Sequence, residues 1–300
     1  MKVLVIGSGG QLGLEFQKIS NSYDSLSWVF STIKTLDLLR LDTINSFLND
    51  INPSVIINCA AYTSVDKAET ESKLANTINY KAVDIISRWT SDNNKKLIHV
   101  STDYVFDGLS KLPLSENSNT NPINEYGSSK LKGEQVCLKN DTNSIIIRTS
   151  WLYSSFGNNF LKTMIELMKK NNSVKVVNDQ IGSPTYAYDL AKVILKIIVN
   201  YKTESGLFHY SNEGEISWFE FARSIRELYK LDCEIIGVSS DEFKTLAKRP
   251  KYSLLDKSKI KTTFNLEIPN YKQSLKNCIE IITNGGNQII SITSLHFIVH

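Results

Sequence analysis

The sequence is poor in cysteine, with four in 300 residues. Cys59, Cys137, Cys233 and Cys278 form no CxxC pair. Their spacing fits neither a zinc site nor a disulfide framework. We therefore expect isolated buried thiols in a reducing compartment.

Long apolar runs and clusters of one charge are missing as well. No stretch of ~20 apolar residues is present, so no membrane-spanning helix is expected. The first residues lack the charged and long apolar regions of a signal peptide, which favours a cytoplasmic location. The net charge of +3 comes without basic blocks, whereas nucleic-acid binding needs clustered Lys and Arg. We expect neither nucleic acid nor a membrane as a partner.

Short apolar runs alternate regularly with longer helical patterns. The runs are KVLVI (2–6), LSWVF (26–30), SVIIN (54–58), KLIHVS (96–101) and SIIIRTS (144–150). Helical patterns lie between them, most clearly at 66–90 and 126–139. Continuous β-branched strands separated by helices indicate a parallel sheet covered on both faces. The predicted fold class is α/β, a doubly wound parallel sheet of the Rossmann type.

A glycine-rich loop, GSGGQLG, follows the first predicted strand and opens a helix. Gly7, Gly10 and Gly13 would allow a tight turn and a close approach of the backbone to a pyrophosphate. The helix N-terminus then offers free N–H groups to the phosphates. The alternative is a simple strand-to-helix turn, which the position directly after a clean strand makes less favoured.

The end of the second predicted strand bears on the choice of cofactor. An acidic residue there would accept the ribose hydroxyls of NAD. Here Ser31 and Lys34 occur, and no carboxylate comes before Asp37. A small hydroxyl and a cation suit a 2′-phosphate, so we favour NADPH over NADH. The alternative is a solvated loop with an incidental lysine.

A smaller α/β lobe is predicted at the C-terminal edge of the sheet. Further strands are expected at 174–179, 207–211 and 234–238, and helices at 187–199 and 217–230. We assign residues 1–150 with about 174–211 to the dinucleotide-binding domain, and about 151–173 and 212–283 to a substrate-binding lobe. The tail 284–300 has no assigned role.

Tyr126 and Lys130 stand four residues apart in EYGSSK, on one face of a predicted helix. Such pairs commonly lie on a surface. Here the pair opens a helix, and the preceding strand ends on Thr102, where open α/β sheets place ligands. We therefore place these three residues at one site.

These motifs resemble an extended short-chain dehydrogenase/reductase. Further stretches resemble the dTDP-4-dehydrorhamnose reductase family: NCAAYTSVDKAE (58–69), STDYVFDG (101–108), RTSWLY (148–153), GNNF (157–160), NDQIGSPT (178–185) and KRP (248–250). The resemblance runs from Met1 to about Ile282. Each stretch is short, but their common order makes chance agreement improbable.

The resemblance implies a reaction, in which NADPH, or NADH, reduces the C4 ketone of a dTDP-linked 4-ketosugar to give dTDP-L-rhamnose. Tyr126 would donate a proton to the carbonyl oxygen, and Thr102 would hydrogen-bond that oxygen. Lys130 would lower the pKa of Tyr126 and bind the nicotinamide ribose.

Further roles transfer by position. The cofactor contacts implied are Gly10, Gln11 and Leu12 at the pyrophosphate, Asp37 and Leu38 near the adenine, and the loop Ala61, Tyr62 and Thr63. The substrate contacts implied are Asp103, Trp151 and Arg249. Trp151 could instead be a core aromatic residue, and Arg249 a solvated cation.

Some members of the family place a Mg²⁺ ligand at a dimer interface, which would make Glu15 a metal ligand and the protein a homodimer. A solvated glutamate in the first turn of a helix is the alternative. The acidic partner expected near SPTYAYD is in uncertain register, at Asp189 after Tyr188, which argues against a metal site.

Two other functions stay open. Related reductases act on other nucleotide-linked 4-ketosugars with the same catalytic residues. Some relatives with this fold are non-catalytic regulatory subunits, but these often lose the tyrosine–lysine pair that this chain keeps.

Overall fold

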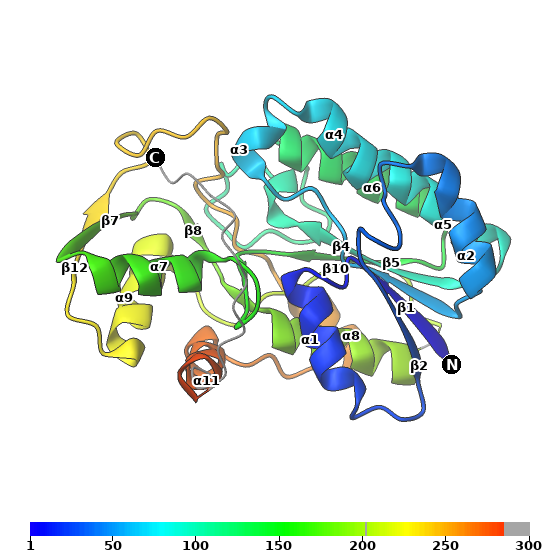
Figure 1. Ribbon diagram of the computed structural model, residues 1–300. Coiled ribbons are helices and arrows are strands. Elements are labelled where there is room, and N and C mark those ends of the chain that lie inside the picture. The colour runs from blue at the N-terminus through cyan, green and yellow to red at the C-terminus, as the bar shows by residue number, and fades with distance from the viewer. Residues whose placement is uncertain (202, 285–300) are drawn as a thin grey trace.

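The computed structural model describes residues 1–201 and 203–284. Its centre is a six-stranded parallel sheet in the order β10-β5-β4-β3-β1-β2 (Figure 1). The strands are β1 (Lys2–Ile6), β2 (Ser27–Ser31), β3 (Val55–Asn58), β4 (Lys96–Thr102), β5 (Ile145–Thr149) and β10 (Gly206–His209). The predicted doubly wound α/β fold is confirmed.

Helices cover both faces of this sheet. α1 (Gln11–Ser20) and α8 (Ala187–Asn200) lie on one face, and α2 (Ile44–Ile51), α5 (Ala82–Asp92) and α6 (Glu125–Asn140) lie on the other (Figure 1). Strands covered on both sides are mainly apolar, and all residues of β3 and β5 are buried, including Asn58 and Arg148 near their carboxyl ends. Within the described part of the chain, no helix is long and apolar enough to cross a membrane.

The order of the strands reverses at β1. The chain passes from β1 to β2 on one side and then returns to β3 on the other side of β1. Ile6 pairs with both Ser31 and Asn58, so the three strands end at the same edge. Open α/β sheets bind ligands at this kind of switch point, and the glycine loop that follows β1 lies there.

The region 66–90 is not the single helix that the sequence predicts. It consists of α3 (Val65–Ala68), α4 (Ser72–Asn76), a π-helical turn at Thr77–Lys81, and α5. The π turn brings Asn79 into the interior, where it is 1% exposed. A π turn thus stands where the sequence predicts a regular helical turn.

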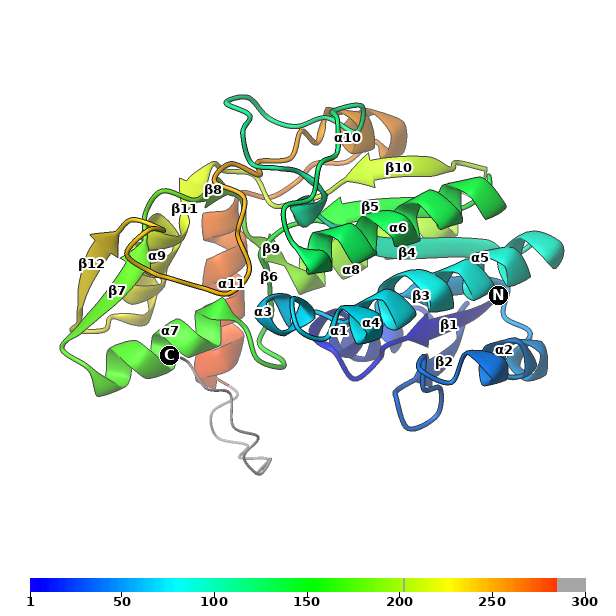
Figure 2. The same cartoon turned by 90° about the horizontal axis from the view of Figure 1, so that it is seen from above.

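A smaller lobe packs beside the carboxyl edge of the sheet (Figure 2). β7 (Ser173–Val177) pairs in parallel with β12 (Glu234–Val238), next to α7 (Phe160–Lys170) and α9 (Trp218–Tyr229). In the same lobe β6 (Leu152–Tyr153) pairs with β9 (Thr185–Tyr186), β8 (Ile181–Gly182) pairs with β11 (Ile216–Ser217), and α11 (Tyr271–Asn284) packs against α9. Helix α10 (Ser258–Phe264) packs instead against β10 of the six-stranded sheet.

The assignment of the strand at 174–179 to the dinucleotide-binding domain was wrong. This strand, β7, pairs with β12 and not with the six-stranded sheet. Its partner is distant in the sequence, and an apolar run by itself does not reveal its sheet. Of the tail at 284–300, residues 285–300 lie outside the described residues.

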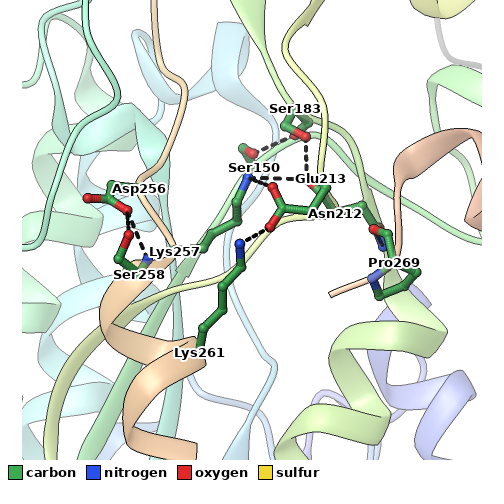
Figure 3. A network of polar contacts seen from close by, with 9 residues as sticks. All are labelled: Ser150, Ser183, Asn212, Glu213, Asp256, Lys257, Ser258, Lys261 and Pro269. Carbon is green, nitrogen blue, oxygen red and sulfur yellow. Dashed lines mark hydrogen bonds and ion pairs between the residues drawn. The ribbon is translucent and has the colours of Figure 1, made fainter. Parts of the chain in front are cut away.

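A buried polar network joins the two parts of the molecule (Figure 3). Ser150, after β5, donates to the carbonyl of Ser183 at 2.6 Å, and Ser183 Oγ donates to the carbonyl of Asn212 at 2.6 Å. Lys257 Nζ lies 3.4 Å from the same carbonyl and 3.2 Å from Glu213 Oε2. Segments after β5, β8 and β10 are thereby fixed to the start of α10.

Candidate active site

The glycine loop is shaped by close backbone contacts. Gly7 has φ +79°, and a Cβ there would lie 2.6 Å from the amide nitrogen of Ala60. A Cβ on Gly13 would lie 2.4 Å from Ser8 Cα. The amides of Gly7 and Ser8 both donate to the carbonyl of Ser31 at 2.9 Å. The first turn of α1, with its unpaired N–H groups, is thus held at the switch point of the sheet.

The side chains of Gln11 and Leu12, both predicted to lie at the pyrophosphate, have different surroundings. Gln11 Oε1 accepts a hydrogen bond from Asn159 Nδ2 at 2.9 Å, which ties the loop to the N-cap of α7 in the small lobe. The Leu12 side chain is buried in the core with the α1 and α8 residues. Only the backbone of Leu12 can therefore face a phosphate.

The loop after β2 holds the residues that bear on the choice of cofactor. The Ser31 hydroxyl is 3.0 Å from Thr35 Oγ1, and the Lys34 side chain is exposed. Asp37 Oδ1 accepts from the amide of Leu39 at 2.9 Å. Leu38 is buried in the core, so its side chain is not available to a ligand.

Asn79, which the sequence analysis did not single out, holds the loop Ala61-Tyr62-Thr63. The amide of Tyr62 donates to Asn79 Oδ1 at 2.8 Å, and Asn79 Nδ2 donates to the Tyr62 carbonyl at 3.1 Å. Asn79 Nδ2 also donates to Ser129 Oγ at 2.9 Å, next to Lys130. The apolar pattern over 66–90 is that of a regular helix and does not indicate the π turn that orients Asn79.

The structure brings Thr102, Tyr126 and Lys130 together. Asn124 caps α6 by accepting from the amide of Gly127 at 2.7 Å, and Tyr126 follows in the first turn. Thr102, the last residue of β4, hydrogen-bonds Tyr126, which lowers the tyrosine pKa. Burial outweighs this effect and raises the pKa of Tyr126 to about 12. The phenol therefore holds its proton near neutral pH.

Lys130 is buried behind this pair. Its Nζ donates to the carbonyl of Val100 at 2.7 Å, and burial lowers its pKa to about 8, against the raising effect of Glu134. The expected lowering of the Tyr126 pKa by Lys130 is not what the structure shows, since desolvation is the largest influence on that phenol.

His99 lies beside the Lys130 amine. Asn58 Oδ1 accepts from the amide of Ala60 at 3.2 Å, which turns Asn58 Nδ2 toward His99 Nδ1 at 3.2 Å. His99 Nδ1 thus faces the Asn58 amide, and its Nε2 lies 3.4 Å from Lys130 Nζ. Burial and the Lys130 charge both lower the pKa of His99, which stays neutral.

A cavity of about 880 Å³ opens next to this group. Its wall includes Tyr104, whose ring meets the ring of Tyr126 edge-on with a centroid separation of 5.6 Å. Arg249 and several lysines also face it, so an anionic ligand suits its charge. The cationic residues are Lys175, Lys244, Lys248, Arg249 and Lys251.

Trp151 does not offer a free ring to this cavity. Its indole stacks on Trp218 with centroids 3.7 Å apart, and a Cβ on Gly182 would lie 2.9 Å from it. Trp218 is the indole that lines the cavity. Asp103, next to Thr102, is 2% exposed, and burial raises its pKa to about 6 against hydrogen bonds from Ser253 and Thr102.

Comparison with known proteins bears on this site. The family model described as the RmlD substrate binding domain matches residues 1–284. A dTDP-4-dehydrorhamnose reductase of Aggregatibacter actinomycetemcomitans is 38% identical over 92% of this chain and 97% of that protein. The chain belongs to the dTDP-4-dehydrorhamnose reductase family.

Solved structures of this reductase family agree closely with the fold. The dTDP-4-dehydrorhamnose reductase of Clostridium acetobutylicum has a TM-score of 0.91 and 38% identity, covering 94% of this chain and 100% of its own. The enzyme of Bacillus anthracis, in complex with NADP, has a TM-score of 0.88 and 38% identity, covering 93% and 98%. The family predicted from the motifs is confirmed.

Glu15, the metal ligand that the reductase family suggests, is fully buried. Its Oε1 accepts from Ser154 Oγ at 2.6 Å, and Oε2 has no hydrogen-bond partner. Asp189 Oδ2 is engaged with Asn212 and Ser274. Mg²⁺ needs six oxygen ligands, usually with several waters, and no group of three candidate ligands occurs in residues 1–201 and 203–284. These residues do not fit a magnesium site.

Proposed function

We propose that this protein reduces the C4 ketone of dTDP-4-dehydro-L-rhamnose to dTDP-L-rhamnose, for cell-surface polysaccharide synthesis, with NADPH as the hydride donor. The observation that carries the proposal is the meeting of Thr102, Tyr126 and Lys130 beside a cavity of nucleotide-sugar size. The names of the relatives support the substrate, and the NADP complex of the Bacillus anthracis relative supports the cofactor.

The six-stranded domain has the residues to hold the cofactor. The amides around Gly10 and Gln11 would take the pyrophosphate, and Lys34, with Ser31, would take the 2′-phosphate. Asp37 and the loop Ala61–Thr63 would line the adenine and nicotinamide sides. When bound, NADPH supplies the hydride.

The protein's own groups manage the proton and the charge. Thr102 hydrogen-bonds the carbonyl oxygen and holds it within reach of Tyr126. Because its pKa is about 12, Tyr126 carries a proton at neutral pH and can donate it as charge develops on that oxygen. Lys130, one helical turn away, would bind the nicotinamide ribose of the cofactor.

The experiment is a spectrophotometric assay of NADPH consumption with dTDP-4-dehydrorhamnose, run beside CDP- and GDP-linked 4-ketosugars. We expect turnover with the dTDP sugar and a loss of about 10²–10⁴-fold in Tyr126→Phe, which lacks only the donating hydroxyl. Turnover with a CDP or GDP sugar alone would move the function to another ketosugar reductase. No turnover with any of them would favour a regulatory subunit.

A further inference from the structure

One segment of the small lobe crosses back over the large domain. After β12 the chain runs to α3 and then past the start of α6 (Figure 1). We call residues Ala247–Lys251 the strap. The segment that leads into the strap is fixed by Asp179. Its Oδ1 accepts from the amide and the hydroxyl of Ser240 at 2.9 and 2.6 Å.

Asp66 of α3 holds the strap by two kinds of contact. Its Oδ1 accepts from the amide of Ala247 at 3.0 Å. Both carboxylate oxygens face the Arg249 guanidinium, with Oδ1 3.3 Å from Nη1 and Oδ2 2.6 Å from Nη2. Such a fork fixes the direction of the guanidinium as well as its position.

Asn124 holds the strap at a second point. Its Oδ1 caps α6 through the amide of Gly127, while its Nδ2 donates to the carbonyl of Lys248 at 2.8 Å. A single side chain thus joins the strap to the helical turn that carries Tyr126.

Arg249 is placed between the cavity and the reaction centre. It lines the cavity together with Tyr104, which meets Tyr126 edge-on, and it hydrogen-bonds Tyr104. A guanidinium has five N–H donors. The Asp66 carboxylate accepts from two of them, the Ala247 carbonyl from one and Tyr104 from one, which leaves one donor for a ligand.

We propose that Asp66 and Asn124 are positioning residues, which dock the strap on the catalytic helix so that Arg249 binds the diphosphate of the sugar nucleotide. This inference rests on the proposed function for the identity of the ligand. Sugar-nucleotide binding and the placement of Tyr126 are then coupled through the strap.

Simple charge reasoning leads to the opposite expectation for Asp66. Its carboxylate neutralises Arg249 and lies near an anion site, so removing its charge should strengthen the binding of a diphosphate. If positioning dominates, the same removal weakens binding because Arg249 loses its direction. The two accounts therefore differ in the sign of the effect.

The test measures KM for dTDP-4-dehydrorhamnose and for NADPH in Asp66→Asn, Asp66→Glu and Asp241→Asn. Asp241 lies in the segment after β12 and lines the same cavity. Asp241→Asn therefore removes one negative charge near the anion site without altering the contacts between Asp66 and the strap. We expect Asp66→Asn to raise the sugar-nucleotide KM about tenfold, with KM for NADPH within about twofold. Asp66→Glu should recover part of the loss, and Asp241→Asn should leave the KM equal or lower.

Asn124→Ser tests the second anchor. Serine is a good N-cap, so α6 keeps its cap, but the bond to the strap is lost. We expect a higher sugar-nucleotide KM at an unchanged melting temperature. A lowered or unchanged KM in Asp66→Asn, or an equal rise in both KM values, would overturn the proposal.

Binding of dTDP alone, followed by the shift in melting temperature, separates this proposal from the proposed function. A shift in the parent that shrinks in Asp66→Asn supports the strap even where the ketosugar is not reduced. If the parent reduces the ketosugar but dTDP raises the melting temperature of the parent and of Asp66→Asn equally, the proposed function stands and the role of the strap is rejected. A parent that dTDP does not stabilise also rejects it.

Discussion

Replacing Glu134 with glutamine should uncover a buried charge next to the active site. Glu134 of α6 and Arg148 of β5 have side chains 2% and 4% exposed. Arg148 Nη2 lies 2.7 Å from Glu134 Oε2, Nε lies 2.9 Å from Oε1, and Ser101 Oγ donates to Oε1 at 2.5 Å. The pair therefore fixes the strand residue that precedes Thr102.

His209, the other neighbour of Arg148, cannot replace the carboxylate. Its Nδ1 faces the carbonyl of Leu114 at 3.0 Å, and a carbonyl only accepts, so Nδ1 carries the hydrogen. Nε2 then accepts from Arg148 Nη1 at 3.3 Å. Burial and the Arg148 charge lower the pKa of His209 to about 3, so the ring is neutral and supplies no counter-charge.

Breaking a buried ion pair by removing one charge typically costs about 3–5 kcal/mol of unfolding free energy. We predict that loss for Glu134→Gln, which would lower the melting temperature by about 10 °C in a chain of this size. Thermal and urea unfolding, followed by circular dichroism, measure both quantities.

The control is a double-mutant cycle with Arg148→Met. Arg148→Met leaves the carboxylate unpaired and should also be costly, whereas the double variant leaves no unpaired charge. We expect the loss of unfolding free energy in the double variant to be smaller than the sum of the two single losses by more than about 1 kcal/mol. Additive losses, or a Glu134→Gln protein within about 1 kcal/mol of the parent, would refute the reasoning.

Three further predictions follow from the same geometry. Burial raises the folded pKa of Asp103 to about 6, above its value in the unfolded chain, so this group stabilises the fold below about pH 4 and the contribution is lost as the pH rises through 6. Relative to Asp103→Asn, the parent should lose about 2 kcal/mol of unfolding free energy between pH 4 and pH 7. Trp151→Ala should cost about 3 kcal/mol of stability. Trp218→Phe should keep the melting temperature of the parent but reduce the rise in melting temperature that dTDP causes. The reverse pattern would show that Trp151, and not Trp218, contacts the substrate. The parent should have a lower KM for NADPH than for NADH, and Lys34→Glu should narrow or reverse that difference; equal use of both by the parent would show that this loop does not discriminate.

The sheet could be predicted from the sequence because its strands are continuous apolar runs between helices, a pattern that a doubly covered parallel sheet requires. The pairing of β7 could not, since its partner β12 lies about sixty residues later and an apolar run is the same in either sheet. The π turn at Asn79 likewise depends on tertiary contacts with Tyr62 and Ser129.

In the candidate site, too, local sequence patterns indicate some residues, whereas others depend on contacts that are distant in the sequence. Thr102, Tyr126 and Lys130 could be found because strand ends and the spacing along a helix place them locally. The role of Asp66 could not, although it lies within a motif of the family, because its partners Ala247 and Arg249 come from the other end of the chain.

The central claim is direct hydride transfer to the C4 carbon of the sugar, and isotope transfer tests it most directly. The protein is incubated with dTDP-4-dehydrorhamnose and NADPH carrying deuterium at both C4 positions of the nicotinamide, and the product is examined by proton NMR and mass spectrometry. The account predicts dTDP-L-rhamnose with one deuterium bound to C4 of the sugar, and about 10²–10⁴-fold less of this product in the Tyr126→Phe reaction over the same time. A reduced sugar with hydrogen at C4, or deuterium at another carbon, would contradict it.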